Sequence, residues 1–166
     1  QIKNQTLKEY LIENLSIFSF SDRDQIIFLV LIDSINDDGY LIESLENIIE
    51  AIPFDLNIKL KELEDILKLI QNSSSPGIGA RNLSECLSLQ LKVIKGNEKL
   101  TDIAFKICNE SLNLLGNKNY SLIKNNLKCS DSELNESIKL IKSLNPKPGQ
   151  VFQRIDPQDF IKADTK

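Results

Sequence analysis

The sequence contains no histidine, and this absence removes several kinds of chemistry at once. Histidine is the usual general base, the base of most catalytic triads and the commonest metal ligand. The three cysteines, Cys86, Cys108 and Cys129, form no C-x-x-C zinc pair, and an odd number of them argues against a disulfide framework. Free thiols fit a reducing cytoplasm. We therefore expect a protein without metal or cofactor that is not an enzyme.

The sequence also lacks methionine and any long apolar run. A translated protein needs an initiator, so the absence of Met predicts a segment of a longer chain. The longest apolar run, Ile26 to Ile32, is much shorter than the roughly 20 residues of a membrane-spanning helix. The first ten residues show no signal-peptide pattern. We expect no contact with a membrane.

Glycine is scarce, with six residues, and its pattern excludes two kinds of ligand loop. Gly77 and Gly79 resemble the start of a dinucleotide fingerprint, but Asn82 stands at its third position and no Walker lysine follows. A calcium loop aligned on Gly39 would begin at Ser34 and end at residue 45, a leucine, so both terminal carboxylates would be missing. Neither nucleotide nor calcium binding is expected.

Hydrophobic residues recur at helical spacing along most of the chain, which predicts an all-α fold of about seven to eight helices with no sheet. The apolar run at residues 26–32 could also be a buried strand, but the charged capping residues before it favour a helix. Capping residues are expected at Thr6 with Glu9, Ser21 with Asp24, Ser44, Asn82 with Glu85, and Ser130 with Glu133. The expected helices are residues 7–17, 22–36, 44–52, 60–70, 83–95, 100–115, 121–127 and 132–143.

Three short segments that contain glycine separate these helices, and we call them stops because each is expected to end a helix. Asp37-Asp38-Gly39 predicts the end of the second helix, with Gly39 as its C′ residue. Pro76 fixes φ, Gly77 and Gly79 allow positive φ, and Asn82 then starts a new helix. Pro146, Pro148 and Gly149 form the last stop. The expected units are a helical subdomain at residues 1–75, a second one at 76–149, and an extended or disordered tail at 150–166.

Two ten-residue segments resemble each other. Residues 62–71, ELEDILKLIQ, and residues 133–142, ELNESIKLIK, are identical at five of ten positions. Each segment follows a shorter expected helix, and a stop rich in Pro and Gly follows each within a few residues. This shared order predicts a duplicated unit that resembles a helix-turn-helix.

Charge is unevenly distributed along the chain. Residues 1–52 contain 3 Lys/Arg and 10 Asp/Glu, whereas residues 53–166 contain 17 and 14. An acidic first third does not suit a dedicated nucleic-acid binder and would suit a protein partner with a basic surface. On charge alone, a solvated acidic face without a partner is the favoured alternative.

Three strings of residues resemble one family. Residues 37–41, DDGYL, residues 76–91, PGIGARNLSECLSLQL, and residues 144–149, LNPKPG, occur in this order and at about these spacings in the sigma-54 (RpoN) family of bacterial transcription factors. Residues 20–41 are also similar to the family's core-binding region. The resemblance covers nearly the whole chain.

The resemblance implies a helical, cytoplasmic module that binds the core of bacterial RNA polymerase, chiefly its β and β′ subunits, as a monomer. Promoter DNA and the AAA+ activator would be bound through other regions of the intact factor. Candidate polymerase-binding residues are Asp37, Asp38, Tyr40, Arg81, Glu85 and Gln90. Residues expected to shape the motifs are Gly39, Pro76, Gly77, Gly79, Asn82, Pro146, Pro148 and Gly149.

Most of these candidates also have a structural alternative. Asp37 and Asp38 could simply form the turn. Arg81 precedes a helix N-terminus, where a cation gains nothing from the dipole, so it could pair with a nearby acid instead of a partner. Glu85 could complete the cap, and Gln90 could form a hydrogen bond across the subdomain junction.

An alternative function is a DNA-binding module that uses the duplicated units. The second part of the chain is mildly basic, and its lysines include Lys118, Lys124, Lys128, Lys139, Lys142 and Lys147. Such a protein would lose DNA affinity steeply as salt rises.

Overall fold

A computed structural model describes residues 5–152 of the 166-residue chain. Within this range it contains nine α-helices, two 3-10 helices and two isolated β-bridges, with no strand, which confirms the all-α prediction. The helices are α1 Leu7–Leu15, α2 Asp22–Asp33, α3 Leu45–Glu50, α4 Leu60–Ser73, α5 Leu83–Val93, α6 Glu98–Glu110, α7 Leu112–Gly116, α8 Tyr120–Leu127 and α9 Asp131–Lys142, with η1 Phe54–Leu56 and η2 Pro148–Phe152.

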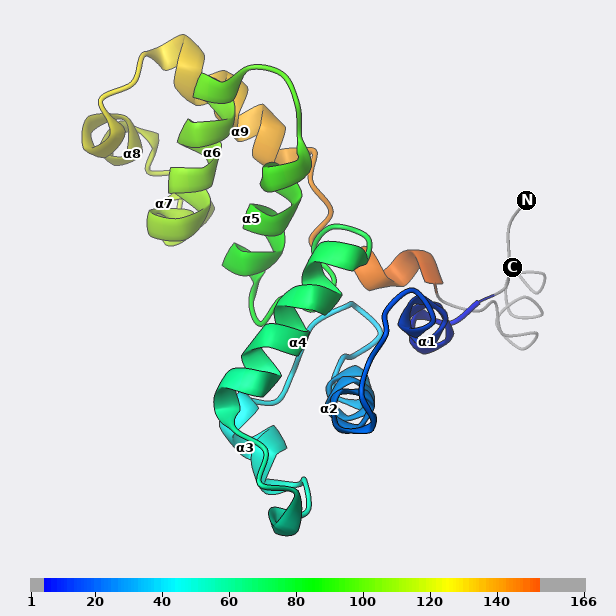
Figure 1. Cartoon of the computed structure of the whole chain (residues 1–166). Helices are drawn as coiled ribbons and strands as arrows, with labels where there is room; N and C mark the ends of the chain where they lie inside the picture. The colour runs from blue at the N-terminus through cyan, green and yellow to red at the C-terminus, as the bar shows by residue number, and fades with distance from the viewer. Residues whose placement is uncertain (1–4, 153–166) are drawn as a thin grey trace, which may run out of the picture.

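The helices form two groups, α1–α4 and α5–α9, and the segment after α9 runs back from the second group to α1 (Figure 1). Each group encloses a hydrophobic cluster, because each amphipathic helix buries its apolar stripe against its neighbours. One cluster runs from Leu7 to Ile78 along the chain, and the other runs from Leu87 to Ile141. The expected apolar helix α2 is central to the first cluster, where Ile27 and Leu31 are fully buried.

The predicted caps define most of the helix starts. The side chains of Thr6, Ser21, Ser44 and Ser130 each accept a hydrogen bond from a backbone N–H in the first turn of the helix that follows. Asn97 was not predicted as a cap. Its side chain accepts bonds from the N–H groups of residues 99 and 100, so α6 begins at Glu98, before the expected start at residue 100.

Several expected helix ends are wrong by two or three residues, and one expected helix is two helices. Helix α2 ends at Asp33, not residue 36, because Asn36 turns the chain by accepting bonds from the N–H groups of Asp38 and Tyr40. Gly39 is therefore not the C′ residue of α2, although its φ of +102° does require glycine. The expected helix at residues 100–115 is two helices, because Ser111 leaves helical geometry with φ −133° and ψ 22°.

The two similar segments occupy matching places in α4 and α9. Glu62 and Glu133 are both the third residue of their helix, and each carboxylate accepts the backbone N–H three residues earlier. A residue in the left-handed conformation, Asn57 or Lys128, lies five positions before each glutamate. This matched geometry supports the predicted repeat.

The predicted extended or disordered tail is wrong at residues 150–152, which belong to η2. The Phe152 ring stacks on Tyr10 of α1 with centroids 4.5 Å apart, so burial of two aromatic faces holds this end of the segment in place. Residues 153–166 of that prediction lie outside the described part of the chain.

Candidate functional site

The three predicted stops, far apart in sequence, lie against one another. We call residues 36–41, 76–82 and 145–150 the three-loop junction. The Leu41 N–H donates to Ala80 O at 2.9 Å, the Gly79 N–H donates to Gly39 O at 2.8 Å, and the Gly149 N–H donates to Asp38 O at 2.9 Å. Backbone pairing thus joins all three loops, which lie between the two helix groups (Figure 1).

Close backbone approach explains the glycines of the three-loop junction. A Cβ on Gly149 would lie 2.4 Å from Asp37 O and 2.6 Å from Gly39 N, which backbone atoms cannot accommodate without moving. Gly77 and Gly79 have φ of +97° and +88°, and Pro148 packs against both Gly39 and Gly77. These residues shape the junction because a side chain would separate the loops.

Gln90 clamps the third loop to α5. Its Nε2 donates to Asn145 O at 2.7 Å, and its Oε1 accepts from the Asn145 N–H at 2.8 Å. The Tyr40 hydroxyl donates to Pro146 O at 2.6 Å. Two of the candidate binding residues therefore have partners within the junction.

Arg81 and Glu85 form a closed pair at the start of α5. The guanidinium donates from Nε and Nη2 to the two carboxylate oxygens at 3.0 and 2.8 Å, and the Arg81 N–H also donates to Glu85 Oε1. Burial alone would raise the pKa of Glu85, but these bonds hold it below its usual value. Asn82 caps the helix by accepting the Glu85 N–H at 2.9 Å. The Glu85 carboxylate thus bonds Arg81 instead of returning to the cap residue as a capping box would.

Asp37 and Asp38 differ in exposure. Asp37 is exposed, whereas Asp38 is half-buried and accepts a bond from Gln150 Nε2 at 3.2 Å. Among the six candidates, Asp37 and Arg81 are therefore the exposed residues, and Gln90 is buried.

A small apolar cluster of Ala80, Cys86 and Leu89, with Tyr40 beside it, fills the space under the loops. Burial raises the pKa of the Cys86 thiol, and burial first, then the adjacent thiol, raises the pKa of Tyr40. Burial also raises the pKa of Cys108 to about 11. These groups stay uncharged at neutral pH and act here as packing and hydrogen-bonding groups.

The sequence reasoning missed Gln71 and Asn145. Gln71 Nε2 donates to Gly79 O at 2.9 Å and so holds the glycine loop against α4. A usable signal was present, because Gln71 follows Leu63 and Leu67 at four-residue spacing and so lies on the buried stripe of α4. A polar side chain on such a stripe needs a hydrogen-bond partner. Asn145 contributes only backbone atoms to the clamp, so its identity gave no signal.

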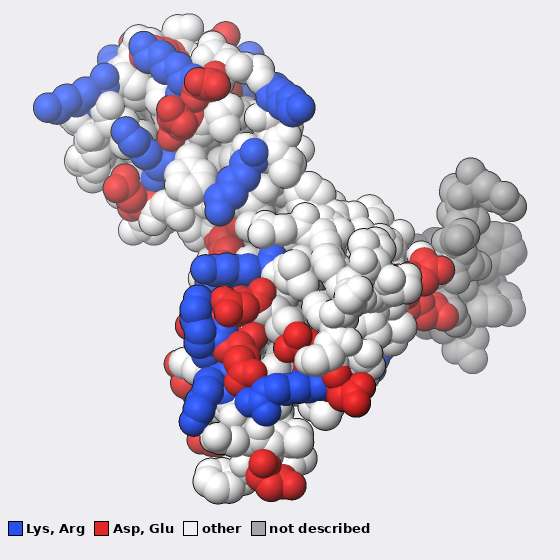
Figure 2. Space-filling view, viewed as in Figure 1, with Lys and Arg blue, Asp and Glu red and all other residues white. Residues whose placement is uncertain are grey.

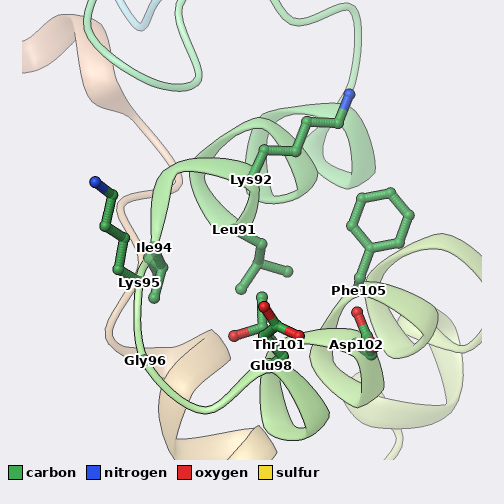
Figure 3. Close-up of a pocket in the computed structure, with 9 residues that line it drawn as sticks. All are labelled: Leu91, Lys92, Ile94, Lys95, Gly96, Glu98, Thr101, Asp102 and Phe105. Atoms are coloured by element: carbon green, nitrogen blue, oxygen red, sulfur yellow. The ribbon is translucent and has the colours of Figure 1, made fainter.

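One hollow of about 410 Å³ between α4 and α5 is lined by Arg81 and Glu85, with Gln71 beside them, but by none of the other four candidates. A hollow of about 570 Å³ between α5 and α6 has Leu91, Ile94 and Phe105 around it, with Lys92 and Asp102 among its polar residues (Figure 3). It contains none of the six candidates. In residues 5–152, no three His, Cys, Asp or Glu residues lie together as metal ligands.

Charged side chains of both signs lie over the α5–α9 group and along α4 in the visible face, and a broad uncharged area lies beside them (Figure 2). Basic residues are spread over the α5–α9 group and alternate with acidic ones along α4, so neither sign forms a continuous surface in this view (Figure 2). None of the described helices is both long and apolar enough to cross a membrane.

Comparison with known proteins connects this arrangement to one family. Residues 1–165 match the family described as sigma-54 factor, core binding domain. The chain is similar to the RNA polymerase sigma-54 factor of Pseudomonas aeruginosa (strain UCBPP-PA14), with 41% identity over 95% of this chain and 32% of that protein. For the factor of Vibrio anguillarum the identity is 39%, over 87% of this chain and 30% of that protein.

The factor of Escherichia coli (strain K12) is 34% identical over 95% of this chain and 33% of its own length. The chain thus spans about a third of the length of these curated relatives. The family match covers both helix groups and the three-loop junction between them, and from it we conclude that the chain belongs to the sigma-54 factor core-binding-domain family.

Proposed function

We propose that this chain is a non-enzymatic binding module that docks on the core of bacterial RNA polymerase, chiefly on its β and β′ subunits. The observation that carries the proposal is the match of residues 1–165 to a core-binding domain family. The acidic first third supports it, because an acidic surface favours a partner with a basic one.

The geometry supports different roles for the six candidates. Asp37 and Arg81 are exposed and are proposed as contacts with polymerase. Tyr40, Gln90 and the half-buried Asp38 are proposed to act indirectly, by holding the three loops together. Glu85 is proposed to position the Arg81 guanidinium. Promoter DNA and an AAA+ activator are proposed as partners of the intact factor, and the module itself as a monomer.

Binding to purified polymerase core tests the proposal. The 166-residue chain should shift the core enzyme on a native gel and raise its mass in light scattering at micromolar concentration. A chain that is helical and folded by circular dichroism but forms no such complex would contradict it. The family match does not favour the alternative of a DNA-binding module.

A further inference from the structure

Phe54 is the most exposed large hydrophobic residue among those described, with 98% of its surface accessible. It begins η1, the turn between α3 and α4, which lies at the end of the α1–α4 group far from α5–α9 (Figure 1). A single exposed hydrophobic residue is ordinary on a protein surface. The supporting structure and the surroundings of Phe54 are what distinguish it.

The turn that carries Phe54 is rigidly held. The Asn57 N–H donates to Phe54 O at 3.0 Å from a left-handed conformation, with φ 50°. Arg23 of α2 then donates from Nη1 to Leu56 O at 2.5 Å and from Nη2 to Asn57 O at 2.7 Å. The same guanidinium bonds both carboxylate oxygens of Glu62. Phe54 is therefore presented on a fixed support, and little backbone freedom would be lost when it binds.

An apolar hollow lies beside the exposed ring. It has a volume of about 460 Å³, and its lining includes Ile49, Ile52, Pro53 and Ile58 as well as Phe54 itself. A projecting ring next to a hollow is complementary to a protein surface that has a pocket for the ring and an apolar side chain for the hollow. Interfaces use such buried aromatic anchors as the centre of their binding energy.

The charges around this site define the partner further. Glu50 lines the hollow and Asp55 follows Phe54, and both are exposed. Lys59 is the basic residue of the same lining, and Arg23 at the turn is paired with Glu62, so acidic side chains outnumber unpaired basic ones here. Glu50 is the last residue of α3, where an acidic side chain is unfavourable to the helix dipole. Its charge therefore does not serve the stability of α3. An acidic rim repels nucleic acid and attracts a protein surface rich in Lys and Arg.

We propose that the Phe54 ring inserts into an apolar pocket on the partner and that an apolar side chain of the partner fills the adjacent hollow. Lys and Arg side chains of the partner surround its pocket. The inference rests on the proposed function, since it takes the polymerase core to be that partner. It places a contact 13 residues along the chain from residue 41, the end of the nearest of the three loops, on a part of the surface that the junction does not reach.

Binding measurements on Phe54→Ala and Phe54→Leu test the anchor, with Ile17→Ala as the matched control because Ile17 is 70% exposed outside the site. Phe54→Ala should weaken binding to purified core at least about tenfold, as loss of a buried aromatic anchor does. Phe54→Leu should recover part of the affinity, and Ile17→Ala should change it less than about twofold. All three should keep the melting temperature, because neither side chain is buried in the fold.

A second pair of changes tests the acidic rim. Glu50→Gln combined with Asp55→Asn should weaken binding at low salt and reduce the dependence of affinity on salt. Equal binding by Phe54→Ala and the unsubstituted chain would overturn the anchor and leave the proposed function standing. Failure of the unsubstituted chain to bind core would instead overturn the proposed function, and with it the identity of the partner.

Discussion

Gly149 is constrained by the backbone of another loop. The three atoms closest to a Cβ at this position are Asp37 O, Gly39 N and Asp38 C, at 2.4 to 2.7 Å. None of them is the flexible end of a side chain. Any larger residue must therefore push the first and third loops apart and break the bond from the Gly149 N–H to Asp38 O.

Gly149→Ala is expected to destabilise the protein by about 2 kcal/mol, the usual cost of overpacking a tight site. Urea unfolding followed by circular dichroism would measure this. Gly116→Ala is the control, because Gly116 lies in α7 with nothing within 4 Å of an added Cβ, so this change should leave the stability unchanged or raise it slightly. Equal stability of the two variants would contradict this prediction, because it would mean that the first and third loops move apart at little cost in free energy.

Gln90 is a second residue whose side chain is determined by its contact with one other residue, Asn145. Its amide must donate to Asn145 O and accept from the Asn145 N–H, and only 9% of the residue is exposed. A carboxylate has the same shape but cannot donate when it is ionised.

Gln90→Glu is expected to lower stability by about 2 kcal/mol at neutral pH, because Asn145 O then faces a buried negative charge without a donor. Acidification toward pH 5 should restore part of this loss, since a protonated carboxyl donates again and burial raises its pKa. Melting temperatures across pH would show this. The exposed substitution Gln25→Glu should give no such recovery, and a loss that is independent of pH would contradict the clamp.

At the scale of elements, α4 and α9 are built alike. In each, a glutamate at the third position caps the helix and forms an ion pair with an earlier helix, Glu62 with Arg23 and Glu133 with Lys99. Each ion pair holds the first turn of the long helix against the earlier helix that supplies the cation. In α4 it also reaches η1, because Arg23 holds the carbonyls of that turn.

The pH dependence of stability should reveal the Glu62 pair. The hydrogen bond from Arg23, followed by that from the Lys59 N–H, lowers the pKa of Glu62 to about 2 from 4.5. A lowered pKa stabilises the fold above the ordinary value, and this contribution is lost as pH falls from about 4.5 toward 2.

Glu62→Gln should therefore lower the melting temperature by a few degrees at pH 7, and its curve should meet that of the unsubstituted chain near pH 2. The effect is modest because solvent screens a partly exposed pair. Glu110→Gln, at the exposed end of α6, is the control. Two curves that stay parallel down to pH 2 would contradict the role of this pair.

At the scale of the whole molecule, the three-loop junction connects the two helix groups. One buried cluster lies mainly in α1–α4 and the other in α5–α9, which supports the proposed division into two helical subdomains near residue 76. The first loop bonds to both of the other loops, and Gln71 holds the second loop against α4.

Gly77→Val combined with Gly79→Val should weaken binding to polymerase core while most helical signal at 222 nm persists. Both positions have positive φ, and a Cβ on Gly77 would lie 3.0 Å from Cys86 Sγ and from Gln90 Nε2. At Gly79 a Cβ would lie 3.2 Å from Gln71 Cγ and in ordinary contact with Ile70 and Leu67 at the edge of the first cluster, so the substitutions disturb mainly the junction. Gly96→Val, where φ is also positive but space is open, is the control. Unchanged affinity would mean that the junction does not matter for docking.

The sequence by itself determined the helices, most of their caps and the family. These depend on local spacing and on short-range hydrogen bonds, such as Ser130 with Glu133, which form within one turn. The end of α2, the break at Ser111 and the position of residues 150–152 were mispredicted, since contacts from other parts of the chain or local turn geometry override periodicity there.

The tertiary structure alone decided that the three stops meet. The sequence predicts separate turns at Gly39, Gly77 and Gly149. A glycine indicates backbone freedom, but the sequence does not show which other loop lies close to it. Only the packing of two helix groups brings Asn145 to Gln90 and Pro146 to Tyr40. It likewise leaves Phe54 exposed, because a hydrophobic residue at a helix end gives no sign in the sequence of whether its own fold or a partner covers it.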